Sequence, residues 1–377
     1  MRKTSLAAAA VLTAGLAQPA FASEPLKVTI GGDVVTGFYV IDADNSGTTS
    51  FQDTKVAVVA RNIDVVAEGV LDNGLKVGVD AKLALGSDSF QTNPAANNNG
   101  SASFRQLFSY VEGNYGRVEI GGTDGAAFKM HFTSPWFVPG NGVDYPNISN
   151  AGTTYSPAMP VTYSVMATNA NKITYFTPRI MGFQLGGSFT PTVVNSLTHA
   201  NGLGLVSKAS LPIRDVREIA LNYVGTFGGV DFGADGFYTM GTSNLSSNEP
   251  KEYGAGTNIA FQGFTLGGAW AKAKDLDSTL TGKPIAREDR TTWTAGLSYA
   301  TGPWTVGLAY LHSSVTSPNY IGSFDGRKSS TLQTGGGYEL GSGVKLGLDL
   351  LYEKNKQFSG APTLTSKSAG LVLDIGF

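Results

Sequence analysis

The residues of this chain with the clearest chemical potential are charged side chains in and around one long loop. Within the loop they are Asp124, Lys129, His131 and Asp144, and on neighbouring segments Lys76, Asp80, Lys82, Arg117 and Glu119. Opposed charges across a narrow aqueous passage create a transverse field. At ~10 Å separation and an effective dielectric constant of 20–80, one pair interacts by only ~0.4–1.7 kcal/mol. Such groups would discriminate modestly between ions, and salt would weaken that discrimination.

Two arginines belong to the same set of candidates. Arg61 and Arg105 lie in segments whose alternation does not fix which face they occupy. The first of these segments loses its phase around Val58 and Val59, which is typical of a β-bulge.

A second constellation has the spacing of a calcium-binding loop. Asp42, Asp44, Ser46 and Asp53 stand at positions 1, 3, 5 and 12, with Gly47 at position 6. The flanking segments are strand-like, however, and position 12 holds Asp in place of the longer bidentate Glu. We therefore expect a polar loop that turns at residues 45–47 and no cofactor. Calcium at these residues is the alternative.

Catalysis would need a nucleophile or carboxylate placed beside a histidine. The chain has three histidines, His131, His199 and His312, and no cysteine. Asp124 and Ser134 are near His131 in sequence, but a loop rich in glycine and proline brings such residues together by chance. We expect no enzymatic activity. Catalysis is an alternative that a lipid-hydrolysis assay would detect.

The elements that position these residues are segments with alternating apolar and polar side chains, the pattern of strands with one apolar face. Glycine-containing tight turns and long polar connections alternate strictly between them, as in an up-and-down barrel with turns at one rim and loops at the other. We predict sixteen strands, at residues 27–40, 55–70, 75–85, 102–112, 116–122, 172–178, 182–191, 216–227, 229–240, 251–262, 264–273, 291–300, 303–313, 329–340, 344–354 and 365–377.

The third long connection, residues 123–171, has no sustained strand pattern. A structureless segment of this length inside a compact domain is usually functional. Its aromatic residues and prolines suggest packing against another surface, so we predict that it folds into the bore of the barrel and narrows it. Phe128, Phe132, Trp136 and Phe137 would either pack this loop against the wall or form part of an aromatic path for a solute.

Composition agrees with a membrane barrel. The first 22 residues have a positive start, an apolar run and a small-x-small site at residues 20–22, so we read 1–22 as a signal peptide and 23–377 as one domain. No later stretch approaches 18 consecutive apolar residues, which excludes transmembrane helices. The formal net charge of −2 gives no basic patch for a nucleic-acid partner.

Several stretches together resemble the sixteen-stranded general porins of Gram-negative outer membranes. They are the opening VTIGGD (residues 28–33), GRVEIGGTDGAAF (116–128), KITYFTPRIMGFQLGGSF (172–189) and the closing strand that ends in Phe377. The resemblance covers the chain after the leader and depends on order, spacing and ending.

This resemblance implies a homotrimer of water-filled barrels in outer-membrane lipid. Each barrel would pass ions and small hydrophilic solutes by passive diffusion. The third loop would form the constriction, with acidic loop residues facing basic wall residues. The terminal aromatic, Phe377, would be the signal that the outer-membrane assembly machinery reads. The alternatives are a substrate-selective outer-membrane channel, an outer-membrane barrel enzyme and a purely structural or adhesive barrel.

Overall fold

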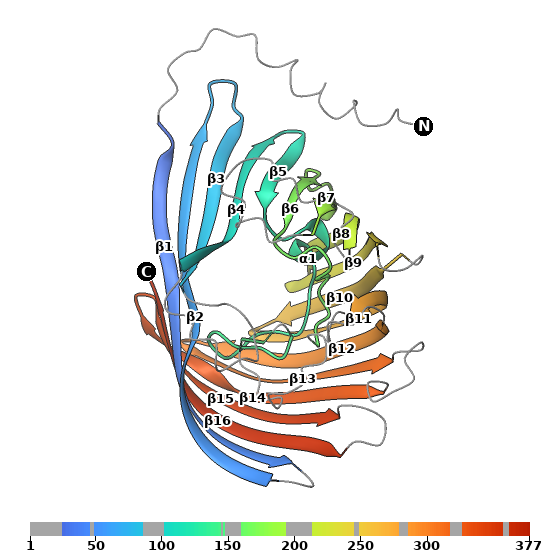
Figure 1. Cartoon of the computed structure of the whole chain (residues 1–377). Helices are drawn as coiled ribbons and strands as arrows, with labels where there is room; N and C mark the ends of the chain where they lie inside the picture. Colours follow the sequence, from blue (N-terminus) through green and yellow to red (C-terminus); the bar gives the residue numbers. More distant parts are fainter. Residues whose placement is uncertain are drawn as a thin grey trace.

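The computed structural model describes residues 25–45, 49–85, 102–144, 146–147, 160–193, 213–244, 249–278, 286–316, 326–356 and 362–377. The expected leader, Ser46 and His199 lie outside these residues. Sixteen strands form one closed barrel in which β1 pairs with β16 and every other strand pairs antiparallel with its sequence neighbours (Figure 1). The prediction of a sixteen-stranded antiparallel barrel is therefore confirmed. The described residues contain no helix with the length and hydrophobicity of a membrane span.

The strands have the following bounds: β1 Lys27–Asn45, β2 Thr49–Val70, β3 Lys76–Leu85, β4 Ala102–Gly113, β5 Gly116–Gly122, β6 Asn171–Phe176, β7 Phe183–Thr192, β8 Ile213–Phe227, β9 Val230–Ser243, β10 Lys251–Phe261, β11 Phe264–Ser278, β12 Ala286–Thr301, β13 Trp304–Thr316, β14 Arg327–Gly341, β15 Val344–Lys356 and β16 Thr363–Gly376. The short helix α1 (Ala126–Lys129) follows β5.

Several strands extend further toward the loop rim than predicted. β1 continues through Asn45 and β2 begins at Thr49, so most of the expected polar connection 41–54 is a paired ladder. The physical reason is that alternation marks only the part of a strand with one face in lipid. Beyond the membrane both faces meet water, and the backbone ladder continues without an apolar period.

Tight turns close the opposite rim. Between β8 and β9, Gly228 and Gly229 have φ values of 57° and 82°. A two-residue hairpin turn with positive φ at both positions matches the twist of the strands and favours glycine.

Register shifts explain the two positions with blurred phase. Val35 pairs with Ala60 but Thr36 pairs with Val58, which leaves Val59 unpaired and confirms the predicted bulge. Likewise Lys82 pairs with Gln106 but Leu83 pairs with Phe104, so Arg105 is the extra residue of a bulge in β4. A bulge redirects its side chain, so alternation alone could not orient Arg105.

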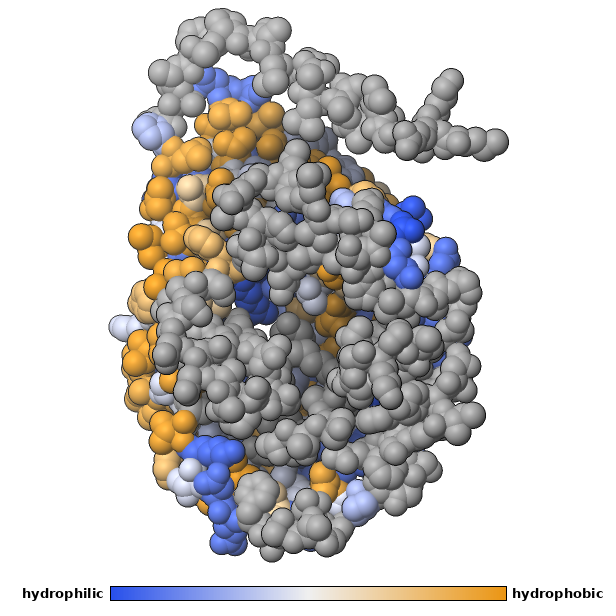
Figure 2. All heavy atoms as spheres, in the orientation of Figure 1, coloured by the Kyte–Doolittle hydropathy of each residue, from blue (hydrophilic) through white to orange (hydrophobic). Residues whose placement is uncertain are grey.

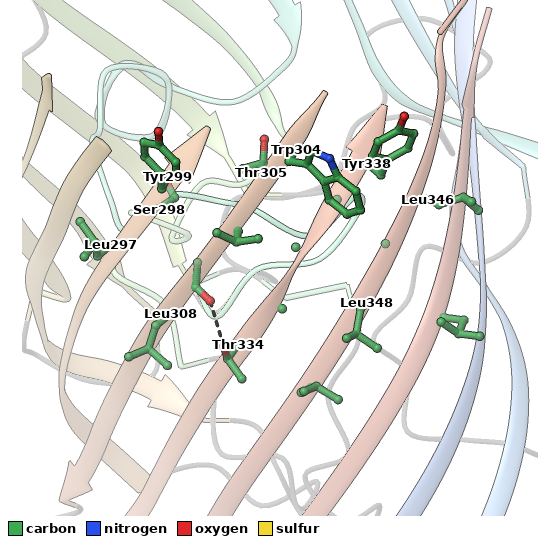
Figure 3. Close-up of a pocket in the computed structure, with 18 of the residues that line it drawn as sticks. Leu297, Ser298, Tyr299, Trp304, Thr305, Leu308, Thr334, Tyr338, Leu346 and Leu348 are labelled. Atoms are coloured by element: carbon green, nitrogen blue, oxygen red, sulfur yellow. Dashed lines mark hydrogen bonds between the residues drawn. The ribbon is translucent and has the colours of Figure 1, made fainter. Parts of the chain in front are cut away.

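The outer wall is apolar between two belts of aromatic side chains. On β11, β12 and β13 the belts are six residues apart, at Phe264 and Trp270, at Tyr299 and Trp293, and at Trp304 and Tyr310. Figure 2 shows the apolar band on the side that carries β1. Figure 3 shows the outer face of β12–β15. Tyr299, Trp304 and Tyr338 form a row near the turns, and Leu297, Leu308 and Leu348 lie farther from the turns than this row. Aromatic girdles around an apolar band are typical of membrane-spanning barrels.

Candidate functional site

The long loop after β5 lies inside the barrel and follows its inner wall. Its α1 segment contacts inward-facing residues of β7 and β8: the backbone N–H of Ala126 donates to Ser188 Oγ (2.8 Å), and that of Ala127 to Glu218 Oε2 (3.1 Å). Further along, Val138 and Val143 share one apolar cluster with Val35 of β1. Figure 1 shows this segment crossing the interior of the barrel.

Glycines on the inner wall make room for the loop backbone. A Cβ atom added to Gly267 would lie 2.8 Å from the carbonyl oxygen of Thr133, and one added to Gly347 would lie 2.7 Å from the ring of Pro139. Real Cβ atoms do not approach other atoms this closely. Loop atoms also lie against Gly256 of β10 (the carbonyl oxygen of Phe132), Gly296 of β12 (Ser134 Cβ, 3.1 Å) and Gly307 of β13 (the ring of Phe137). Together with Gly267 of β11 and Gly347 of β15, these glycines form one track around the wall. We call these five residues the glycine track.

Carboxylates of the wall hold the loop at both ends of this track. Asp235 of β9 accepts the backbone N–H of Phe132 (2.7 Å) and contacts His131 Nδ1 (3.0 Å). Asp349 of β15 accepts hydrogen bonds from Asn141 Nδ2 (2.8 Å), Gln333 Nε2 (2.8 Å) and Tyr39 Oη (3.1 Å). Each carboxylate therefore joins a wall strand to a different part of the loop.

The returning half of the loop is anchored in the same way. Glu252 of β10 accepts hydrogen bonds from Ser164 Oγ (2.8 Å) and from the backbone N–H groups of Val165 and Met166 (both 3.0 Å). The guanidinium of Arg290 lies 3.5 Å from its other oxygen. Because burying a charge is costly unless it is paired and hydrogen-bonded, this arrangement fixes the loop firmly to the wall.

A buried lysine joins the two ends of the loop. Lys172 Nζ at the start of β6 donates to the carbonyl oxygens of Thr168 (2.6 Å) and Ala170 (2.8 Å), and also to that of Thr123 at the end of β5. An ammonium group has three donors and no acceptor, so three carbonyl groups satisfy it.

Two predicted constriction residues are buried structural groups. Asp144 is fully buried and accepts hydrogen bonds from the backbone N–H of Thr162 (2.9 Å) and from the hydroxyl groups of Thr133 and Thr162. The His131 side chain is buried too, between Asp235 and Thr162 Oγ1 (3.0 Å). The prediction that Asp144 and His131 face the passage is wrong, because both side chains are buried, Asp144 against two threonines of the loop and His131 between the wall and the loop.

The calcium arrangement is also contradicted. Asp42 and Asp44 lie in β1, where they pair with Gln52 and Ser50, and Asp53 in β2 pairs with Ile41. Since adjacent residues of a strand point to opposite faces, Asp53 is on the face opposite to Asp42 and Asp44. These carboxylates therefore do not converge, and the described residues contain no cluster of three metal-ligating side chains.

The remaining charged candidates line the inner wall of β2–β5 as ion pairs. Lys76 Nζ lies 2.7 Å from Glu68, and Lys82 Nζ lies 3.6 Å from Asp64. Asp80 is half-buried on the same face of β3, next to Lys82. Charges of both signs therefore alternate along this wall instead of separating onto two sides. A space-filling view shows an opening near the centre of the barrel with hydrophilic side chains at its edge (Figure 2).

The loop contributes Lys129 to this wall. Its Nζ lies 2.5 Å from Glu119 Oε2, and the other oxygen of Glu119 accepts a hydrogen bond from Arg117 Nε (2.8 Å). Arg117 also contacts Glu112 (3.1 Å) and lies 3.8 Å above the ring of Tyr110. The expectation of acidic loop residues facing a basic wall is thus reversed at this point, where the loop supplies the cation.

Asp124 stands where the loop leaves β5. Gln106 Nε2 donates to its carboxylate (2.7 Å), and burial raises the pKa of Asp124 while the charges of Arg105, Lys172 and Lys129 oppose this shift. The bulge thus brings Arg105 within electrostatic reach of Asp124. The backbone of Arg61 pairs with Val34, and its side chain lies outside the described part of the chain.

Most loop aromatics pack within the protein. Phe137 is buried against Gly307, the ring of Phe132 lies over Gly233, and Phe128 stacks on Tyr163 with ring centroids 4.5 Å apart. Trp136 is 42% exposed. Of the two interpretations of these residues, the contacts favour packing over an aromatic path for a solute.

At the chain end, Phe377 completes the junction between β16 and β1. Its backbone N–H donates to the Gly32 carbonyl oxygen and its carbonyl oxygen accepts the Gly32 N–H, both at 3.0 Å. The ring is exposed on the turn rim.

Sequence reasoning missed Lys172 and the wall carboxylates Glu218, Asp235, Glu252 and Asp349. Each of them occupies an inward position, and their alternation with outward residues could have identified them as lumen groups. Sequence alone could not identify the groups that they bind. Each carboxylate binds loop residues 86 or more positions away, and Lys172 binds backbone carbonyl groups, which every residue carries.

Comparison with known proteins gives consistent relatives. A model of the family described as Gram-negative porin matches residues 6–357. An uncharacterized protein of Rickettsia typhi is 22% identical over an alignment of 329 residues, and the match covers 66% of this chain and 74% of that protein. The anion-selective porin from Comamonas acidovorans superposes with a TM-score of 0.61 and 17% identity, covering 93% of this chain and 99% of that one.

A further solved structure is the trimer form of OmpT, an outer membrane protein of Vibrio cholerae. It has a TM-score of 0.60 and 12% identity, and covers 94% of this chain and 100% of that one. Identities this low show likeness of fold alone.

Proposed function

Because the chain belongs to the Gram-negative porin family, we propose that it passes ions and small hydrophilic solutes by passive diffusion through a loop-narrowed passage. As a porin it is an outer-membrane channel. The observation that carries the narrowing is the path of the loop. It follows the inner wall from β7 to β15 and meets the charged wall of β2–β5 through residues near its ends, Asp124, Lys129 and Asn169. Sixteen-stranded barrels are wide enough for an aqueous channel, so a segment bound inside the barrel reduces that width.

We assign the edge of the passage to charged residues on both sides of the opening. They are Asp80, Lys82, Arg105 and Arg117 of the wall and Asp124 and Lys129 of the loop. Glu119 is buried between Arg117 and Lys129, and Lys76 lies nearer the turn rim. Most of these charges are paired within a few ångströms of an opposite charge. Each pair presents little net field to a passing ion, so ion selectivity is weak and salt-dependent.

Removing one charge of this set should change ion selectivity without preventing assembly. Asp124→Asn should shift the reversal potential in a KCl gradient toward anion preference, and Lys82→Met should shift it toward cation preference. Because burial raises the pKa of Asp124, acidification of the wild-type channel should imitate Asp124→Asn at a higher pH than an exposed aspartate would require. Planar-bilayer recordings measure both effects.

Lys272→Met is the matched control, because Lys272 of β11 pairs with Tyr253 on the outer face of the barrel, beside Trp270. It should leave the reversal potential near the wild-type value. Unchanged reversal potentials in both test variants would remove Asp124 and Lys82 from the passage.

We also propose a homotrimer, a cleaved leader at residues 1–22 and recognition of Phe377 by the assembly machinery of the outer membrane. Support for the trimer comes from the fold shared with a barrel whose structure is a trimer. Support for the role of Phe377 is its exposed ring on the turn rim, at the junction that closes the barrel. Cross-linking in detergent tests the trimer, and Phe377→Ala tests assembly through the yield of folded protein.

A further inference from the structure

A polar hollow lies inside the barrel on the turn side of α1. It has a volume of about 520 Å³ and is lined by residues of β4–β8 and of the loop, among them Glu112, Arg117, Glu119, Lys129, Arg179 and Asn222. A solute that has passed Lys129 on its way to the turn rim meets this hollow next. Its lining combines three cations with two carboxylates.

Asn222 lines this hollow and carries a buried polar atom that has no partner among the described residues. The side chain is 7% exposed, and its Nδ2 donates to the carbonyl oxygen of Met130 (3.3 Å). That hydrogen bond fixes the amide orientation, because the opposite one would place two oxygens together. Among the described residues, Oδ1 of Asn222 has no hydrogen-bond donor. A buried acceptor without a partner is costly, so this position favours a ligand that brings an N–H or O–H group.

The cations beside it have donors to spare. Arg117 and Lys129 share the carboxylate of Glu119, which holds their charged groups close together. Their described bonds use Nε and Nη1 of Arg117 and one N–H of Lys129. Arg117 also interacts with the Tyr110 hydroxyl, and two N–H groups of Lys129 remain for an anionic group beside the positive charge of Arg117. A carboxylate matches such a set of charged donors.

We propose that this hollow binds small monocarboxylates that also carry a hydroxyl or ammonium donor. The carboxylate lies against Arg117 and Lys129, and the donor group satisfies Oδ1 of Asn222. The inference rests on the proposed channel function, because it makes the hollow a resting site beside the diffusion path. Recognition is by one charge and one hydrogen bond, so binding is weak and reversible, as passage requires.

Lactate and propionate test this, because they differ by one hydroxyl group and both are fully ionised at pH 7. Saturation-transfer NMR titrations of the purified full-length channel in detergent give both affinities. The wild-type protein should bind lactate about fivefold more tightly than propionate, the effect of one hydrogen bond to a buried group. Asn222→Leu should remove this preference. Lys129→Met should weaken the binding of both acids and leave the ratio of their affinities unchanged.

Asn62→Leu is the matched control, because Asn62 is an inward-facing amide on β2 that donates to Asp33 away from the hollow. It should keep the wild-type ratio. Equal affinities for the two acids in the wild-type protein, or an unchanged preference in Asn222→Leu, would overturn the proposal. If Asn222→Leu does not fold, the wild-type ratio and Lys129→Met still decide. Conductance of the same preparation is measured separately, so failure of the channel and failure of the hollow are distinguishable.

Discussion

Replacing residues 124–169 with Asn-Gly should increase single-channel conductance roughly threefold, because the bare lumen of a sixteen-stranded barrel is a wide aqueous channel. The excision is geometrically simple, since Gly122 and Asn171 are already paired across β5 and β6. A two-residue Asn-Gly turn then closes this hairpin between Thr123 and Ala170. Lys172 loses one carbonyl partner, Thr168, and gains access to water.

The barrel itself should survive this excision, because its ladder closes without the loop through the pairing of β1 with β16. Heat-modifiable mobility in electrophoresis and strand content by circular dichroism serve as controls for folding. An excised channel that folds by both criteria and conducts like the wild type would show that the loop does not narrow the passage.

Asp349→Ala should release the far end of the loop. The variant leaves three buried donors without their acceptor, on Tyr39, Asn141 and Gln333. Each unpaired buried donor costs about 1–3 kcal/mol, and partial relaxation lowers the sum, so we expect the free energy of unfolding to fall by about 3 kcal/mol. Open-channel current noise and protease cleavage within the loop should both increase, because Asn141 no longer holds the loop to β15.

Asp374→Ala is the matched control for this variant. Asp374 is a half-buried carboxylate near the turn rim, and Lys345 of β15 is paired opposite it in the ladder. Denaturant titration should show a much smaller loss of stability for Asp374→Ala, together with wild-type current noise. Similar losses in the two variants would mean that Asp349 acts as an ordinary wall carboxylate rather than as an anchor of the loop.

The alternation of apolar and polar side chains predicted the barrel, because the lipid requires apolar residues on the outer face of every strand. Residues such as Leu346 and Leu348 must face hydrocarbon, so the pattern on their strand records the environment of each side chain directly. The position of the inner loop was predictable for a related reason, since its length and its aromatic residues require a surface to pack against. Where the environment is water on both faces, as at the loop end of β1, no pattern remains and the strand end was predicted too early.

The site was less predictable because it depends on contacts between distant residues. Asp144 and Asp124 look alike in sequence, yet two threonines bury the first and Gln106 holds the second at the edge of the wall. Alternation placed Lys76, Asp80, Lys82, Arg117 and Glu119 on the inner face of the barrel. It could not orient Arg105, because a bulge interrupts the phase, nor reveal that their charges are paired.

Polymer exclusion in planar bilayers tests the central claim most directly. Conductance of the wild-type channel and of the channel lacking residues 124–169 is recorded with neutral polyethylene glycols of increasing mass. A passage narrowed by the loop predicts discrete conductance steps in both proteins, with large polymers excluded from the wild type and admitted by the excised channel. Absence of conductance steps, or one common size limit for the two proteins, would contradict it.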